Sequence, residues 1–111
     1  MTKTAVLITC DTRGDHSSRL VKALRTVREF KRAGEEVYLI FEGAGTKWAE
    51  ELSDPEHRYA PLYRAIGDQG CVCAECAARY QIRTDAAMAQ HESAHPISCS
   101  LLDSGYTVIS F

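Results

Sequence analysis

The sequence predicts an α/β sandwich with a mainly parallel β-sheet. Two short, continuous apolar runs, residues 4–9 and 37–41, have the length and composition of buried strands. Between them, residues 17–33 carry apolar side chains at helical spacing. A strand, a helix and a second strand form a βαβ unit, whose two strands are parallel and whose crossover is right-handed. A third short run, residues 70–72, precedes another helical stretch and repeats this pattern.

The first helix is predicted to end at Gly34 and to be amphipathic. One side gathers its apolar residues: Leu20, Ala23, Leu24, Val27 and Phe30. The basic residues fall mostly on the other side: Arg19, Lys22, Arg25, Arg28 and Arg32. We interpret this basic side as a solvated outer surface, with an acidic partner as the alternative.

The remaining elements are shorter. Residue Thr46 suits an N-cap, Pro61 suits a first helical turn, and Gly105 suits a helix end. Short helices are therefore predicted over residues 46–52, 62–68, 74–80, 84–90 and 95–102. A final strand is predicted over residues 106–111, where apolar and polar residues alternate.

Length and composition favour one domain over residues 1–111, in a protein of the cytoplasm. The chain has 111 residues, of which 45% are hydrophobic and 25% are charged, and its net charge is -2. A nearly neutral chain does not favour nucleic acid as a partner. No apolar run approaches the roughly 20 residues of a membrane span, and the N-terminus lacks the features of a secretory signal. Clustered cysteines in the cytoplasm are more often catalytic or metal-binding than disulfide-bonded.

Three of the five cysteines lie within six residues, at Cys71, Cys73 and Cys76. Cys73 stands at the predicted strand-to-helix junction, where negative charge is favoured, so it is a candidate nucleophile. Cys76, three residues later, is either a resolving thiol or a helix-packing residue. The roles of Cys71, which we expect to face the sheet, and of Cys10, at the end of the first strand, stay open between core and site.

The carboxyl ends of parallel strands are where ligands bind in this fold class. Three segments fall there, residues 10–14, 42–45 and 73–76. The polar residues that could line a pocket at these ends are Asp11, Arg13, Glu42 and Lys47. The alternative is that they serve only ordinary loop chemistry. The glycines of the 42–45 segment lack the spacing of a dinucleotide fingerprint, so we interpret it as a flexible loop and expect no cofactor.

A zinc site is the rival interpretation of the cysteine cluster. Cys73 and Cys76 are followed by His91 and His95 at the spacing of a two-Cys, two-His zinc site. Such sites place their cysteines on a β-hairpin turn, whereas Cys76 begins an alanine-rich helical run. A domain with a βαβ core does not need a metal to fold. We therefore expect the histidines to lie apart from the cysteines and zinc not to be required.

The order of these features resembles the DsrE/DsrF-like family of sulfur-relay proteins. The resemblance rests on four stretches, each typical of the family in its place along nearly the whole chain. They are the opening strand with its turn and long helix, residues 37–44, the cysteine junction at 72–79, and the closing run 105–111.

The resemblance implies a flavodoxin-like α/β fold that assembles as trimers or hexamers. It also implies a persulfide carried on Cys73, with Cys76 as the second family cysteine. Sulfur donors and acceptors, either proteins or small thiols, would then be the partners. Two alternatives stay open: a non-catalytic module that binds a small ligand or zinc, and an interaction subunit with inert cysteines.

Overall fold

The computed structural model describes residues 3–14, 17–66, 70–83, 89–91 and 101–111. Its centre is one five-stranded sheet in the order β4-β3-β2-β1-β5. The strands are β1 (Lys3–Ile8), β2 (Glu36–Phe41), β3 (Gly70–Cys73), β4 (Ala89–His91) and β5 (Thr107–Ser110). Every neighbouring pair is parallel, which confirms the predicted α/β class.

The strand order shows on which side of the sheet each successive strand is added. Strands β1 to β4 are added one after another toward one edge, and β5 returns to the free side of β1. Flavodoxin itself has the order 2-1-3-4-5. The likeness to flavodoxin therefore holds for the layers and the parallel strands, and the order is this fold's own.

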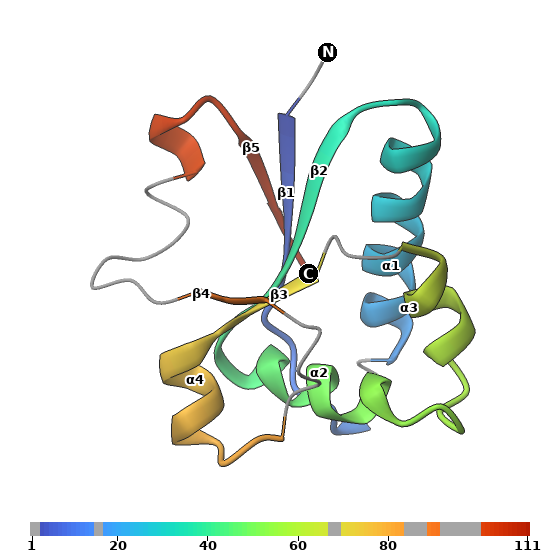
Figure 1. Cartoon of the computed structure of the whole chain (residues 1–111), viewed down its shortest axis with the longest axis vertical. Helices are drawn as coiled ribbons and strands as arrows, with labels where there is room; N and C mark the ends of the chain where they lie inside the picture. The colour runs from blue at the N-terminus through green and yellow to red at the C-terminus, as the bar shows by residue number, and fades with distance from the viewer. Residues whose placement is uncertain (1–2, 15–16, 67–69, 84–88, 92–100) are drawn as a thin grey trace.

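Helices cover both faces of the sheet, as Figure 1 shows. The helices α1 (Ser17–Arg32) and α3 (Ala60–Ile66) pack side by side on one face. A single helical turn at residues 101–103 lies on the opposite side. The α1 helix buries Leu20, Leu24 and Val27, as its periodicity predicts.

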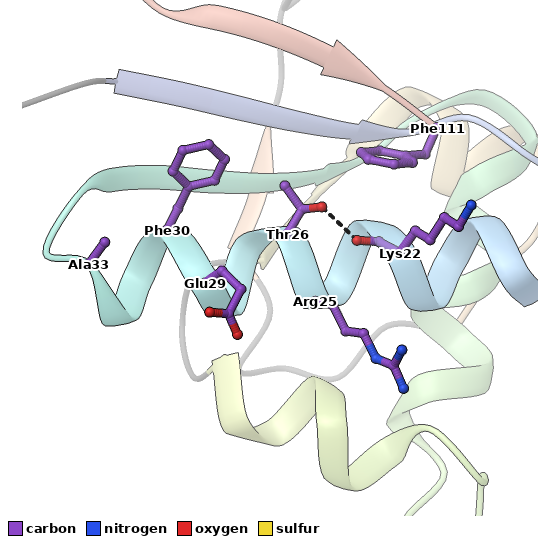
Figure 2. A pocket seen from close by; sticks show the side chains of 7 residues that line it. All are labelled: Lys22, Arg25, Thr26, Glu29, Phe30, Ala33 and Phe111. Carbon is purple, nitrogen blue, oxygen red and sulfur yellow. Dashed lines mark hydrogen bonds between the residues drawn. The ribbon is translucent and has the colours of Figure 1, made fainter.

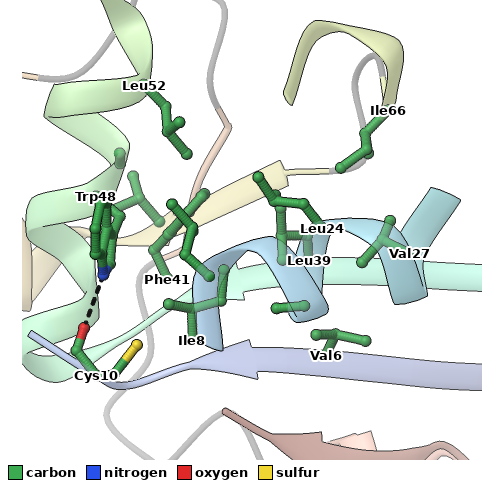
Figure 3. Packing of buried hydrophobic residues seen from close by; sticks show 14 of the residues in the cluster. Val6, Ile8, Cys10, Leu24, Val27, Leu39, Phe41, Trp48, Leu52 and Ile66 are labelled. Carbon is green, nitrogen blue, oxygen red and sulfur yellow. Dashed lines mark hydrogen bonds between the residues drawn. The ribbon is translucent and has the colours of Figure 1, made fainter. Parts of the chain in front are cut away.

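The larger core lies between the sheet and the α1–α3 layer (Figure 3). Alternate strand residues supply its floor, among them Ile8, Leu39 and Phe41, none of which is exposed. The opposite face has a smaller cluster of three buried residues, Ala5, Leu7 and Ile40, with Cys71 packed against it. Because successive strand residues point to opposite faces, this division fixes the direction of every side chain at the strand ends.

Two short helices follow the carboxyl ends of β2 and β3. They are α2 (Thr46–Ser53) and α4 (Ala74–Arg79). Between β2 and α2, Gly43–Gly45 form a 3₁₀ turn. Gly43 has a φ of +58°, and a Cβ on Gly45 would lie 1.9 Å from the carbonyl oxygen of Ile8. The interpretation of this segment as a flexible loop is therefore wrong, because its glycines permit a turn packed against β1.

Three other predicted helices, over residues 62–68, 84–90 and 95–102, extend beyond the described residues, and one of them needs correction. The helix predicted over residues 84–90 is wrong at its end, because Ala89 and Gln90 belong to β4 and pair with β3. The main-chain hydrogen bonds of an edge strand outweigh helix propensity there. Residues 84–88, 67–69 and 95–100 lie outside the described residues.

The expectation that Thr46 is an N-cap is wrong, because Thr46 is the first residue of α2 and Gly45 is its N-cap, with no side-chain capping hydrogen bond. Pro61 lies in the first turn of α3, as predicted. The α3 helix begins at Ala60 and ends at Ile66, and the turn of helix at 101–103 ends before Gly105, whose φ is +86°. Within the described residues, none of the helices has both the length and the apolar character needed to cross a membrane.

Candidate functional site

The ends of β1, β2 and β3 meet at one edge of the sheet, as the sequence predicts for segments 10–14, 42–45 and 73–76. The backbone N–H of Glu42 donates to the carbonyl oxygen of Ile8 at 3.1 Å, which ties the end of β2 to β1. The backbone N–H of Gly43 donates to Cys76 Sγ at 3.3 Å, which ties the same loop to α4. The loop after β2 is therefore tied both to the end of β1 and to α4.

Cys73 is the last residue of β3 and the N-cap of α4. Its extended backbone, with φ −69° and ψ 116°, turns the chain from strand to helix. The half-buried Cys73 Sγ accepts a hydrogen bond from the backbone N–H of Cys76 at 3.4 Å. An N–H donor directed at a sulfur stabilises negative charge on it. The strand-to-helix junction expected for this cysteine is confirmed.

Cys76 lies in the first turn of α4, and its environment favours the protonated thiol. Burial raises its pKa above the ordinary value, and the neighbouring Cys73 and Glu42 raise it further. The hydrogen bond from the Gly43 N–H acts in the opposite direction without cancelling these effects. Cys76 therefore lies close to Cys73 as a protonated partner.

The other two described cysteines have different surroundings. Burial, together with Cys73 and Glu42, raises the pKa of Cys71 to about 11, so its thiol is inert near neutral pH. Cys10 is only 7% exposed and belongs to the larger core, where its carbonyl oxygen accepts a hydrogen bond from Trp48 Nε1 at 3.1 Å (Figure 3). Cys71 thus borders the site, and Cys10 supports it from the core.

A charged pair, Asp11 and Lys47, lies beside the end of α4. Lys47 Nζ lies 3.2 Å from Asp11 Oδ2 and 5.1 Å from the centre of the Tyr80 ring. Burial acts to raise the pKa of Asp11, but hydrogen bonds from the Thr12 N–H and from Lys47 lower it below its usual value. These contacts join the loop after β1 to α2 and to the end of α4. Tyr80 is a contact that the sequence analysis did not single out.

The strand register places Glu42 and His91, both considered in the sequence as possible site residues, beside Cys73. Phe41 pairs with Val72, so the next residues, Glu42 and Cys73, follow at the same level of neighbouring strands. On the other side, Cys73 pairs directly with His91 of β4. The expectation that the histidines lie apart from the cysteines is therefore wrong for the backbone of His91. Parallel pairing of the short β4 edge strand, which sequence periodicity could not detect, brings it there.

The other predicted residues do not add to this arrangement. Arg13 is exposed on the loop after β1, and His95 lies outside the described residues. Among the side chains that the structure describes, no three His, Cys, Asp or Glu residues are grouped so that they could hold a metal ion.

A groove of about 610 Å³, whose lining includes neither Cys73 nor Cys76, lies along α1 beside the end of β5 (Figure 2). Its lining is Lys22, Arg25, Thr26, Glu29, Phe30, Ala33 and Phe111. Phe30 and Phe111 give it an apolar wall on the strand side of α1, while the exposed Arg25 points away from the strands in the same view. The lining contains no nucleophilic thiol, so this groove is separate from the cysteine site.

A parallel α/β protein with free thiols at the carboxyl edge of its sheet is the class that the fold and site define. Comparison of the sequence with known families extends this: the DsrE/DsrF-like family matches residues 3–111. The chain therefore belongs to the DsrE/DsrF-like family.

One curated relative is the uncharacterized protein MJ0733 of Methanocaldococcus jannaschii. It is 27% identical to this chain over 66 residues. The matched part is 60% of this chain and 54% of the relative, so the chain spans about half the length of that protein. The name assigns the relative no activity, and the site must be interpreted from its own residues.

Proposed function

We propose that this protein accepts sulfane sulfur on Cys73 as a persulfide and passes it to an acceptor thiol. The observation that carries the proposal is the position of Cys73 Sγ. Cys73 ends β3 at the carboxyl edge of the sheet, and its Sγ accepts a hydrogen bond from the Cys76 N–H at 3.4 Å. Membership of a sulfur-relay family supports the same chemistry.

The reaction is an exchange between sulfur atoms without net oxidation. The Cys73 thiolate attacks the outer sulfur of a donor persulfide, R–S–SH, and the donor S–S bond breaks. The products are Cys73–S–SH and the donor thiolate R–S⁻. An acceptor thiolate then attacks the outer sulfur of Cys73–S–SH, which returns Cys73 to its thiolate form.

The surroundings of the cysteines favour Cys73 over its neighbours as the carrier. Burial raises the pKa of both Cys71 and Cys76, which leaves them as thiols near neutral pH. Thiolate is the attacking form of cysteine. Cys76 is then the second site residue, able to form a disulfide with Cys73 when sulfur is released.

Donor and acceptor are sulfur-carrying proteins or small thiols, and the setting is the cytoplasm, where thiols stay reduced. A homo-oligomer, either a trimer or a hexamer, is the proposed assembly. Light scattering at micromolar concentration tests this part, and a particle of only about 12 kDa contradicts it.

Intact-mass measurement tests the central step. After incubation with glutathione persulfide and removal of the excess, the wild-type chain should gain one sulfur atom, about 32 Da, on a single cysteine. Cys73→Ser should gain none, while Cys10→Ser, altered in the core and not at the site, should gain the same mass as the wild type. Full uptake by Cys73→Ser contradicts the proposal.

The second candidate function is a binding module for zinc or a small ligand. The observation that favours it is the direct backbone pairing of Cys73 with His91. Elemental analysis of the purified protein decides between the two. One zinc per chain, lost in both Cys73→Ser and His91→Ala, would favour the binding module over the carrier.

A further inference from the structure

We propose that Glu42 preserves the persulfide on Cys73 by preventing Cys76 from discharging it as hydrogen sulfide. The inference rests on the proposed function and extends it. In this proposal the carboxylate of Glu42, at the end of β2, favours transfer of the sulfur to a partner over its loss as sulfide.

The competing reaction takes place within the chain. The Cys76 thiolate attacks Sγ of Cys73–S–SH, the bond between the two persulfide sulfurs breaks, and HS⁻ leaves. The product is a Cys73–Cys76 disulfide. The outer sulfur gains two electrons and leaves as sulfide, and the cysteine pair gives up these two electrons when its disulfide forms. A carrier that loses sulfur in this way must be reduced before it can load again.

The backbone holds Cys76 where this reaction can occur. The Cys76 N–H donates to Cys73 Sγ at 3.4 Å, so the two residues share one turn at the start of α4. The Gly43 N–H donates to Cys76 Sγ at 3.3 Å, so the sulfur of Cys76 is held against the loop that begins at Glu42. Cys76 is therefore close enough to Cys73 to attack a persulfide there, and separation does not prevent the reaction.

The register places Glu42 beside these thiols. Ile40 pairs with Cys71 and Phe41 pairs with Val72, so Glu42 and Cys73 follow at the same level, with strands roughly 4.8 Å apart. Ile40 and Cys71 lie together on the face of the smaller core cluster. Glu42 is extended, with φ −138° and ψ 152°, so strand alternation directs Glu42 and Cys73 to that same face.

The charge of Glu42 acts on the thiols that would compete with Cys73. Burial is the main cause of the raised pKa of Cys76 and of Cys71, and the Glu42 carboxylate adds to both. A like charge nearby disfavours a second thiolate.

Two other carboxylates, those of Asp11 and Glu75, are paired with basic side chains. Asp11 is paired with Lys47 at 3.2 Å. Glu75, on α4 itself, pairs with Arg79 at 3.6 Å, and its side chain is 74% exposed. Among the residues that the structure describes, no salt bridge neutralises Glu42. His91 stands at the register position beside Cys73 in β4.

The test compares Glu42→Gln with Glu75→Gln, a matched change of a carboxylate that is paired and exposed. Each protein is loaded with glutathione persulfide, desalted, and followed at pH 7 for free sulfide and for the Cys73–Cys76 disulfide. Glu42→Gln should release sulfide at least about threefold faster than the wild type, because the charge that opposes the Cys76 thiolate is gone. Glu75→Gln should match the wild type. The double variant Glu42→Gln, Cys76→Ser should return to slow release.

Release from Glu42→Gln at the wild-type rate would overturn the inference. So would fast release from the double variant, because Cys76 would then not be the attacking group. If the wild type takes up no sulfur at all, the proposed function fails. The alkylation rate of Cys76 then tests Glu42 alone: faster alkylation in Glu42→Gln supports its action on Cys76, and an unchanged rate contradicts it.

Discussion

The cysteine edge, where Cys73 and Cys76 lie, and the groove between α1 and the end of β5 differ in the side chains that they offer. The groove offers about 610 Å³ of mostly apolar space but no thiol in its lining. The edge gathers the thiols of Cys73 and Cys76 with the Asp11–Lys47 pair where three parallel strands end. Because ligands in parallel α/β folds bind at the carboxyl ends of the strands, sheet topology favours the cysteine edge over the groove as the candidate site.

The largest expected difference between the two regions is in sulfur transfer. Cys73→Ser should abolish transfer from glutathione persulfide to a small acceptor thiol, because the attacking sulfur is gone. Arg25→Ala, in the lining of the groove, should transfer at the wild-type rate. Sulfane sulfur recovered on the acceptor is the measurement. Equal loss in the two variants would mean that the comparison is wrong and that the groove takes part.

A substitution at Gly45, in the 3₁₀ turn after β2, should lower the stability of the fold. Gly45→Ala places a Cβ 1.9 Å from the carbonyl oxygen of Ile8, so the 3₁₀ turn must move away from β1. We expect a loss of about 2 to 3 kcal/mol in the free energy of unfolding, measured with urea. Ala44→Gly, in the same turn, is the control and should cost less than about 1 kcal/mol. Equal costs would show that Gly45 is not needed for close packing.

The burial of Cys71 predicts a dependence of stability on pH. Its pKa is about 11 in the folded chain, against an ordinary value of 9.0. A raised pKa in the folded state gives stability that is present below pH 9 and lost as the pH rises through about 11. Between these values the wild type should lose on the order of 1 kcal/mol more stability than Cys71→Val. Parallel curves for the two proteins would contradict the assigned burial.

The smallest expected effect concerns the Asp11–Lys47 pair. Both side chains are partly exposed, at 30% and 31%, so the pair is screened by water. Lys47→Met should lower the free energy of unfolding by less than about 1 kcal/mol at low salt, and added salt should reduce the difference. A loss that salt does not change would show that packing on Tyr80, and not charge, is the contribution of Lys47.

The sequence predicted the parts of the fold that depend on strong local patterns. The continuous apolar runs of β1 and β2 and the amphipathic α1 determined the parallel βαβ core, and the junction at Cys73 followed from it. The β4 strand was missed because Ala89–His91 carries no strand periodicity, and only pairing with β3 makes it a strand. Because β4 was not predicted, the pairing of His91 with Cys73 was not predicted either.

The site itself was predictable in position more than in detail. Cys10 follows β1 by two residues and Cys73 ends β3, yet Cys10 packs into the core and Cys73 caps a helix. The difference arises from the Trp48 side chain and the packing of α2, which are tertiary contacts. Likewise, the hydrogen bond from Gly43 to Cys76 joins residues 33 positions apart, and no local pattern reveals it.

The most direct test of the carrier assignment is the alkylation rate of each cysteine as a function of pH, measured peptide by peptide by mass spectrometry on the native protein. Cys73 should react first near neutral pH, with Cys76 slower and Cys71 reacting only as the pH approaches about 11. If Cys76 or Cys71 reacts as fast as Cys73 at pH 7, the assignment of Cys73 as the sulfur-carrying residue is contradicted.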